Sequence, residues 1–244
     1  MREAATRDYA GTVRSVAAMG YAGVELHGFP GTPGISTEKA ARLFGDLGLV
    51  VTSAHTPMPI GAQTDDIISA AKTLGAPCVI SGKGPDDFKT LDLIQKTCDV
   101  FNVANANVRA AGLAFAVHNH WWEYLKVEGR YVYEVMLELL DPAIAFELDT
   151  YWIKTAGIDP AAVVKRMGAR SPLLHIKDGP CVKGEPMTAV GDGVMDIPAV
   201  VAAGGGNTQW LIVEIDRCAT DMFEAVNRSA GYLISHGLAR GAQH

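Results

Sequence analysis

The stretch LAFAVHNH, residues 113–120, joins an apolar run to an abruptly polar end. Its first five positions are apolar without alternation, which is typical of a strand buried on both faces of a parallel sheet. Its last three positions are two histidines that flank an asparagine. The stretch therefore predicts a buried strand whose carboxyl end carries titratable side chains.

Six other short runs have the same character: residues 21–26, 49–55, 76–82, 144–150, 172–178 and 210–216. The segments between them are amphipathic, several begin with Ser, Thr or Asp, and most end in glycine, as helices do. The runs recur at the spacing of a (β/α)₈ barrel, which uses about 30 residues per unit. A doubly wound sheet alternates in the same way, but no GxGxxG follows the first run. We therefore predict an α/β fold of the TIM (β/α)₈-barrel type, as a single domain over residues 1–244.

Composition excludes several classes of function. The net charge is −6 and no long basic run occurs, so we expect neither nucleic acid nor a membrane as a partner. The four cysteines are scattered, which is typical of a reducing compartment. No apolar stretch approaches the roughly 20 residues that span a bilayer. We predict a cytoplasmic protein that acts on a small molecule; the sequence is also compatible with a homo-oligomer.

Four successive predicted strands end in residues that bind metals: His118, Asp149, His175 and Glu214. A single buried histidine is usually a satisfied core residue, but several ionisable groups buried together need a partner. A divalent cation is the natural partner, and this mixture of imidazole and carboxylate suits Mn²⁺, Co²⁺, Zn²⁺ or Mg²⁺. Such an ion can hold two oxygens of a polyol or hydroxyketone and stabilise an enediolate. The sequence therefore predicts a metal site at the mouth of the barrel.

Several stretches together resemble the sugar phosphate isomerase/epimerase family of the xylose isomerase-like TIM-barrel superfamily. They are GYAGVEL, SAHTPMP, VHNHWWEY, FELDTYWIKTAG, LLHIKDG, VGDGVMDIPAV and WLIVEID. The resemblance implies a metal-dependent sugar or sugar phosphate isomerase or epimerase. It implies that Asp149, His175 and Glu214 bind the metal, and it places His118 where ketose 3-epimerases have a first glutamate.

The histidine at position 118 affects the expected acid/base pair, because the resemblance implies that those epimerases move protons with two metal-bound glutamates. Only Glu214 remains of that pair here, and an imidazole bound to a metal cannot take up a proton. His120, two residues beyond His118, is a free candidate for the second acid/base. The HNH sequence resembles inosose dehydratases more than ketose epimerases.

Other residues near the predicted strand ends are candidates for contact with substrate. Trp152 is expected on a loop at the barrel mouth, where a sugar can stack on it, or where it packs under the loop. Glu123 either binds a substrate hydroxyl or is a solvated loop carboxylate. Lys177 either stabilises an oxyanion or phosphate, or pairs with Glu147 inside the barrel. His55 contacts the substrate or a metal-binding residue, or else it makes a core hydrogen bond.

The first strand of a closed barrel is missing from the pattern. Only seven strand-like runs occur, and the chain opens at a segment that follows the first strand in members of the family. We expect a start site placed too late rather than a chain that truly lacks the strand. An open barrel would expose two unpaired edges and part of its core.

The sequence thus predicts a metal-dependent isomerase or epimerase in which Glu214 and His120 move the proton. A lyase is the nearest alternative, because the same enolate can expel a β-hydroxyl group. A non-catalytic sugar-binding barrel is a second alternative. A phosphodiesterase like the apurinic endonucleases of the superfamily is disfavoured by the acidic charge balance.

Overall fold

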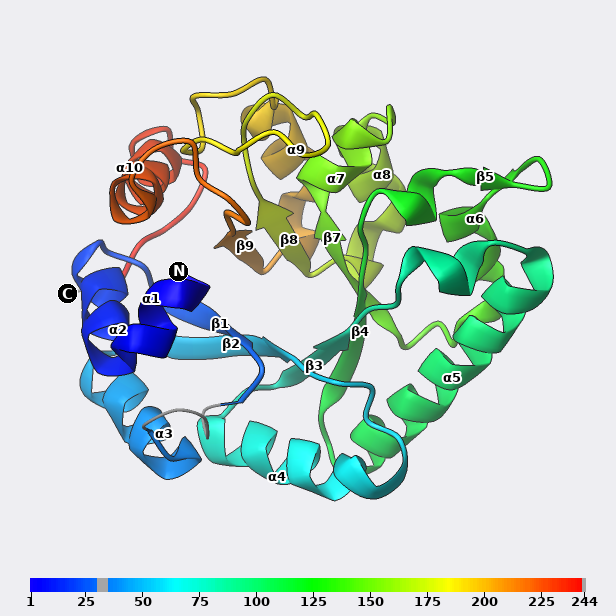
Figure 1. Cartoon of the computed structure of the whole chain (residues 1–244), viewed down its shortest axis with the longest axis horizontal. Coiled ribbons are helices and arrows are strands. Elements are labelled where there is room, and N and C mark those ends of the chain that lie inside the picture. The colour runs from blue at the N-terminus through cyan, green and yellow to red at the C-terminus, as the bar shows by residue number, and fades with distance from the viewer. Residues whose placement is uncertain (30–34, 243–244) are drawn as a thin grey trace.

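The computed structural model describes residues 1–29 and 35–242, and its centre is a sheet of seven parallel strands (Figure 1). Each predicted run forms one of these strands, and six of the strands lie within the predicted bounds, whereas β1 starts two residues later and ends one residue later than predicted. The strands are β1 Gly23–His27, β2 Val50–His55, β3 Cys78–Ser81, β4 Ala114–His118, β7 Ala145–Asp149, β8 Leu173–Ile176 and β9 Trp210–Val213. The prediction of an α/β fold of the TIM-barrel type is confirmed.

The sheet is nearly closed but remains open between its first and last strands. Its order is β1-β2-β3-β4-β7-β8-β9, and every neighbouring pair is parallel. Within the described part of the chain, no hydrogen-bonded pairing joins β1 to β9. The arrangement agrees with the prediction that the first strand of an eight-stranded barrel is missing. Because every strand is parallel, the polar strand ends of the sequence meet at one rim.

Helices surround the sheet on its outer side (Figure 1). They are α1 Arg2–Arg7, α2 Tyr9–Ala18, α3 Thr37–Asp46, α4 Thr64–Leu74, α5 Leu91–Ala110, α6 Val132–Leu139, α7 Thr150–Thr155, α8 Pro160–Met167, α9 Ile197–Gly204 and α10 Met222–Ser235. Side chains cap several of them as expected, for example Ser36 at α3 and Asp221 at α10. Gly75 ends α4 in the left-handed conformation, with φ of 70°, which leads the chain into β3.

Three local features were not predicted from the sequence. The segment after β7 forms the short helix α7, so Trp152 lies on a helix and not on the loop that we expected. Asp149 explains this helix, because its carboxylate accepts a hydrogen bond from the backbone N–H of Trp152 at 3.0 Å. Helices α1 and α2 precede β1, and a small antiparallel hairpin of β5 Lys126–Val127 and β6 Arg130–Tyr131 follows β4.

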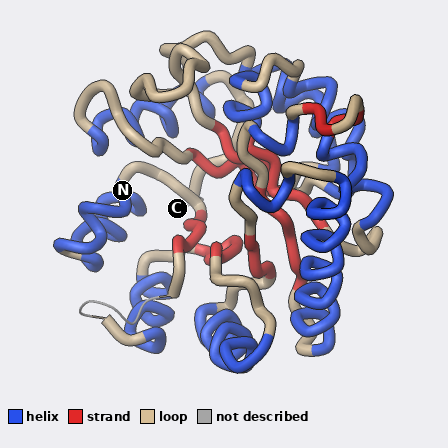
Figure 2. The backbone as a smooth tube through the Cα atoms, turned by 45° about the vertical axis from the view of Figure 1, so that its right-hand side comes forward, coloured by secondary structure: helices blue, strands red, loops and turns tan. Residues whose placement is uncertain are grey.

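Helices and the terminal segments cover the gap that the sheet leaves between β1 and β9. Figure 2 shows both ends of the chain on the open side of the sheet. The hydroxyl of Tyr21 donates to the carbonyl of Val226 on α10, and the N–H of Ala242 donates to the carbonyl of Gly20. These contacts tie the C-terminal segment to the residues that precede β1. The described residues contain no helix that is long and apolar enough to cross a membrane.

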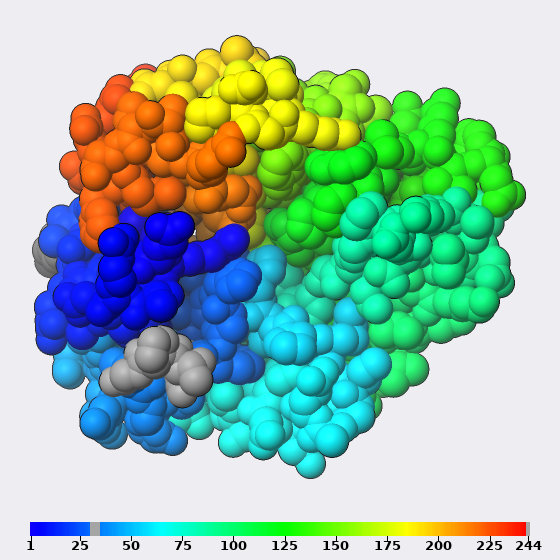
Figure 3. Space-filling view, viewed as in Figure 1, coloured from blue at the N-terminus to red at the C-terminus, as the bar shows by residue number. Residues whose placement is uncertain are grey.

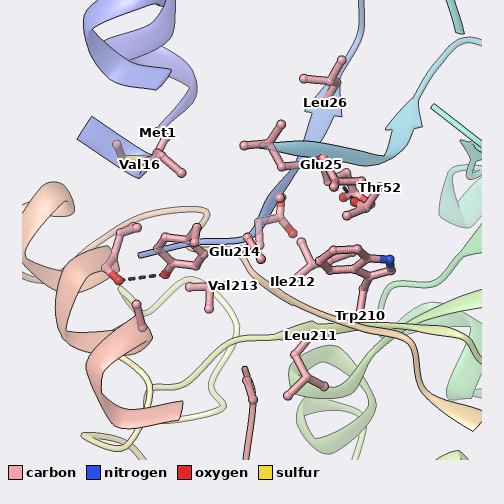
Figure 4. Close-up of a pocket in the computed structure, with 18 of the residues that line it drawn as sticks. Met1, Val16, Glu25, Leu26, Thr52, Trp210, Leu211, Ile212, Val213 and Glu214 are labelled. Carbon is pink, nitrogen blue, oxygen red and sulfur yellow. Dashed lines mark hydrogen bonds between the residues drawn. The ribbon is translucent and has the colours of Figure 1, made fainter. Parts of the chain in front are cut away.

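The gap between β1 and β9 contains a cavity of about 1020 Å³, which we name the seam cavity. Figure 4 shows Trp210 and Ile212 of β9 on one side of it and Glu25 and Leu26 of β1 on another. The indole of Trp210 reaches across to the other edge, since a Cβ on Gly23 would lie only 3.3 Å from its Cζ3. Side-chain packing therefore partly replaces the missing backbone pairing.

Candidate metal centre

A second cavity, of about 480 Å³, opens at the carboxyl ends of the strands, and we name it the mouth cavity. In Figure 3 the surface is hollowed between the blue N-terminal helix and the orange and green segments. Six of the predicted site residues line this cavity: His55, His118, His120, Trp152, Lys177 and Glu214. Asp149 and His175 are buried, and their strand ends lie beside those of the lining residues. Residues at or just after the carboxyl ends of five strands, β2, β4, β7, β8 and β9, therefore converge on one space.

Three of the four predicted ligands form the outer group, which consists of Asp149, His175 and Glu214. One ligand atom from each lies within 4.8 Å of the others. Nδ1 of His175 is 2.8 Å from Oε2 of Glu214 and 3.7 Å from Oδ2 of Asp149. Both Nδ1 of His175 and Oδ2 of Asp149 are buried, and they make ion pairs with Glu214 and with Nζ of Lys177, each at 2.8 Å. An imidazole nitrogen between two carboxylates is a donor set that fits a divalent cation.

The fourth predicted ligand, His118, lies in a second cluster. This inner group consists of His55, His118, Glu147 and His175, again with one ligand atom from each within 4.8 Å of the others. Oε2 of Glu147 lies 2.6 Å from Nε2 of His55 and 3.0 Å from Nδ1 of His118. His175 belongs to both groups, because its Nδ1 faces the outer one and its Nε2 lies 3.2 Å from Glu147.

Glu25 joins the inner group from β1, on the far edge of the sheet. Its Oε1 lies 2.7 Å from Nε2 of His175 and 3.1 Å from Nε2 of His55, while Oε2 accepts from the hydroxyl of Ser53 at 2.5 Å. Glu25 is not among the site residues predicted from the sequence, because its partner His175 is 150 positions away along the chain. The sequence indicates Glu25 only through its place near the end of the first predicted strand, residues 21–26.

Lys177 supplies a buried positive charge beside the outer group. Its Nζ lies 2.8 Å from Asp149, 2.7 Å from Glu214 and 2.7 Å from Asp216. The partner expected inside the barrel, Glu147, is not among its ion pairs in the described structure. Arg2 of α1 adds a second cation, which pairs with Glu214 and lies 3.6 Å from Asp216. No motif in the sequence indicated that Arg2 reaches the site.

These contacts shift the pKa values of the buried histidines in opposite directions. Burial opposes protonation of His55, but the carboxylates of Glu147 and Glu25 outweigh it and raise its pKa to about 10. Burial also opposes protonation of His175, yet Glu147, Glu25 and Glu214 hold its pKa well above the usual value. Burial dominates at His118, whose side chain is only 8% exposed, and lowers its pKa to about 3. His118 is therefore neutral at neutral pH, as a metal ligand must be.

The pKa of the Glu214 carboxylate is also shifted from its usual value. Burial alone would raise its pKa, but His175 and Lys177 hold it well below the usual range. Glu214 is thus ionised at neutral pH, and its side chain is 21% exposed at the mouth cavity. An ionised and partly accessible carboxylate can bind a cation or accept a proton from a substrate.

The HNH segment continues into the η3 turn, Trp122–Tyr124, on the rim of the mouth cavity. The imidazole of His120 stacks on Trp122 with ring centroids 4.1 Å apart and remains about one-third exposed. Glu123 is buried, and its carboxylate accepts from the backbone N–H of His120 at 2.8 Å. Glu123 is not among the residues that line the mouth cavity, so its visible role is to hold His120 in place. Trp152 lines the cavity, with Lys177 above its ring at 5.6 Å.

No protein-family model matches the sequence, and no curated protein matches it either. Solved structures, by contrast, do match this chain. A sugar phosphate isomerase/epimerase from Parabacteroides distasonis ATCC 8503 superposes with a TM-score of 0.81 at 25% identity, over 98% of this chain and 92% of that one. The predicted resemblance to sugar phosphate isomerase/epimerase and xylose isomerase-like TIM-barrel proteins is confirmed by this similarity.

Two solved structures of lower sequence identity share the fold. A probable 3-DHS dehydratase, AsbF of Bacillus anthracis, has a TM-score of 0.74 at 13% identity, over 93% of both chains. A xylose isomerase-like TIM-barrel protein from Mycobacterium smegmatis, in complex with magnesium, has a TM-score of 0.65 at 14% identity. It is matched over 96% of this chain and 90% of its own.

Proposed function

We propose that this barrel is a metal-dependent isomerase or epimerase of a sugar, sugar phosphate or related ketose. The outer group carries the proposal, because one ligand atom from each of Asp149, His175 and Glu214 lies within 4.8 Å of the others. The similarity to a sugar phosphate isomerase/epimerase supports the class of substrate. The mouth cavity has the size of a small-molecule site.

His118, Asp149, His175 and Glu214 would hold one divalent ion, Mn²⁺, Co²⁺, Zn²⁺ or Mg²⁺. When bound, the ion would supply Lewis acidity to a carbonyl oxygen and its neighbouring hydroxyl. The donor set fits an ion of this kind, because it mixes imidazole nitrogens with carboxylate oxygens. The magnesium complex of the Mycobacterium smegmatis barrel supports a cation in this fold.

Glu214 and His120 are the proposed acid/base pair. Glu214 is ionised, and it lines the mouth cavity, so it can accept the proton from the carbon beside the carbonyl. His120 lines the same cavity, with its backbone held by Glu123, and can return a proton from another side. Lys177 carries a charge that can stabilise the oxyanion that develops on the substrate. Trp152 and His55, which also line the cavity, would contact the sugar.

A lyase is the second candidate, supported by the fold shared with a probable dehydratase and by the HNH segment. The two reactions share proton removal from carbon and diverge afterwards. An isomerase returns the proton, whereas a lyase expels a β-hydroxyl group as water. A non-catalytic sugar-binding barrel would bind ligand and do neither.

Incubation with ketoses, ketose phosphates and inososes in deuterium oxide separates these three. Deuterium at one substrate carbon with no loss of water supports isomerisation or epimerisation. A product lighter by one water supports the lyase. Binding without exchange or product across the panel, with a metal-loaded protein, would contradict both enzymatic candidates. Asp149→Asn serves as the control, because it should abolish exchange while the fold persists.

A further inference from the structure

One carboxylate oxygen contacts three imidazoles beneath the mouth cavity. Oε2 of Glu147 lies 2.6 Å from His55, 3.0 Å from His118 and 3.2 Å from His175. Glu147 is fully buried and does not line the mouth cavity, so it cannot touch a substrate there. An ionised carboxylate only accepts hydrogen bonds. Each imidazole nitrogen that faces Glu147 must therefore carry a proton.

The two predicted histidine ligands turn different nitrogens toward this layer. His118 presents Nδ1 to Glu147, whereas His175 presents Nε2 to Glu147 and to Glu25, at 2.7 Å from the latter. A neutral imidazole has one N–H and one lone pair, on opposite nitrogens. With the ion bound, the lone pair of His118 is then on Nε2, and that of His175 is on Nδ1. Nδ1 of His175 lies 2.8 Å from Glu214 and 3.7 Å from Asp149, so the proton that it carries without an ion is the one that a metal displaces.

We propose that Glu147 is a positioning residue that holds His118 and His175 in opposite tautomers, so that both lone pairs point to the metal. The inference rests on the proposed function, because it concerns the same ion. Carboxylates behind ligating histidines raise ligand basicity and fix the ring, and their loss typically lowers metal affinity about 10- to 100-fold. Glu25 assists on the His175 side, and His55 bridges Glu25 and Glu147.

The competing arrangement places an ion inside the inner group itself, with His55, His118, Glu147 and His175 as ligands. That ion would need the lone pair of His175 on Nε2, the nitrogen that donates to Glu25. It would leave Nδ1 of His175, which faces Glu214 and Asp149, outside the metal site. The two arrangements therefore predict opposite metallated nitrogens on His175.

Nitrogen NMR of the zinc-loaded protein, labelled with ¹⁵N-histidine, distinguishes them. Two-bond proton–nitrogen correlations report which ring nitrogen carries hydrogen, and single substitutions assign the seven histidines. We expect His118 to show Nδ1–H with a metallated Nε2, and His175 to show Nε2–H with a metallated Nδ1. A His175 metallated through Nε2, or two zinc ions per chain, would overturn the proposal.

Zinc affinity, measured by competition with a chromophoric chelator, gives the second readout. Glu147→Gln keeps the shape of the side chain but removes the obligatory acceptor, and it should weaken zinc binding about 10- to 100-fold. Glu147→Asp keeps the carboxylate and should recover part of that loss. Glu134→Gln, which removes a surface partner of Arg166, is the control and should bind zinc as the unaltered protein does.

The outcomes separate this inference from the function on which it rests. If the unaltered protein binds one zinc ion and Glu147→Gln binds it equally well, the positioning role is wrong and the proposed function stands. If the tautomers and the affinity change are as expected but no substrate exchanges deuterium, the function is wrong and the positioning role stands. If Glu147→Gln does not fold, the tautomers of the unaltered protein decide.

Discussion

Nζ of Lys177 lies 2.7 Å from Oε2 of Glu214, so a buried ammonium group already balances a carboxylate that we assign to the metal. The same nitrogen contacts Asp149 and Asp216. Two unit charges 4 Å apart interact by about 4 kcal/mol at an effective dielectric constant near 20, so Lys177 must repel a divalent ion nearby.

Replacing Lys177 by Met should therefore tighten divalent-metal binding, by about tenfold or about 1.4 kcal/mol. The same change should lower turnover, because the charge that stabilises the developing oxyanion is lost. Titration calorimetry with Zn²⁺ or Co²⁺ measures the first effect. Lys154→Met, on the neighbouring helix α7, is the control for loss of a positive charge. Weaker metal binding in Lys177→Met would show that this lysine supports the ion.

Asp149 has two roles that substitutions can separate. One carboxylate oxygen caps α7 by accepting the N–H of Trp152, and the other, Oδ2, is the proposed ligand atom and lies 2.8 Å from Nζ of Lys177. Asp149→Asn keeps a cap but removes the ligating charge, so metal should be lost while the helix persists. Asp149→Ala should also lose the cap, which costs about 1 kcal/mol more. Metal analysis and urea unfolding measure both; equal stability of the two variants would contradict the capping role.

Metal binding should release protons at neutral pH. Without an ion, burial opposes protonation of His175, but Glu147, Glu25 and Glu214 hold its pKa well above the usual value. A metal must displace that proton, so affinity should rise as pH increases from 6 to 8. Calorimetry in buffers of different ionisation enthalpy counts the protons released. An affinity independent of pH would mean that His175 binds no ion.

The metal-free protein should lose stability as the solution becomes alkaline. The pKa of His55 is raised to about 10, because Glu147 and Glu25 outweigh the effect of burial. A raised pKa contributes stability that is complete below the unfolded value of about 6.5 and disappears as pH passes the folded value. The melting temperature should fall between pH 7 and pH 10. His55→Gln should be less stable at pH 7 but should show a shallower fall; a parallel fall would remove His55 as the cause.

Much of the fold could be predicted from the sequence, because a buried strand appears as a local run of apolar residues. Strands such as residues 114–118 are apolar until their last position, and glycines such as Gly75 mark helix ends. Glu147 and Asp149 are two positions apart on β7, so their side chains point to the same face of the sheet at different depths, and they occupy different clusters. Alternation along a single strand is a local property, so the sequence suffices for it.

Contacts across the barrel could not be predicted in the same way. The sequence does not show which cluster His118 joins, or that Lys177 pairs with Asp149 and not with Glu147. Both depend on side-chain directions, which the alternation of residues along a strand does not determine. The helix that carries Trp152 was missed because it has only six residues, too few to show a helical period. Arg2 reaches Glu214 from 212 positions away, and no local pattern records such a contact.

Metal content tests the central claim most directly. Elemental mass spectrometry should be applied to the unaltered protein and to His118→Ala and Asp149→Asn, each purified after growth with added Mn²⁺, Co²⁺ or Zn²⁺. We predict about one divalent ion per chain in the unaltered protein and a large loss in both variants. An unaltered, folded protein that holds no ion under any of these conditions would contradict the account and would leave a barrel that binds sugars without a metal.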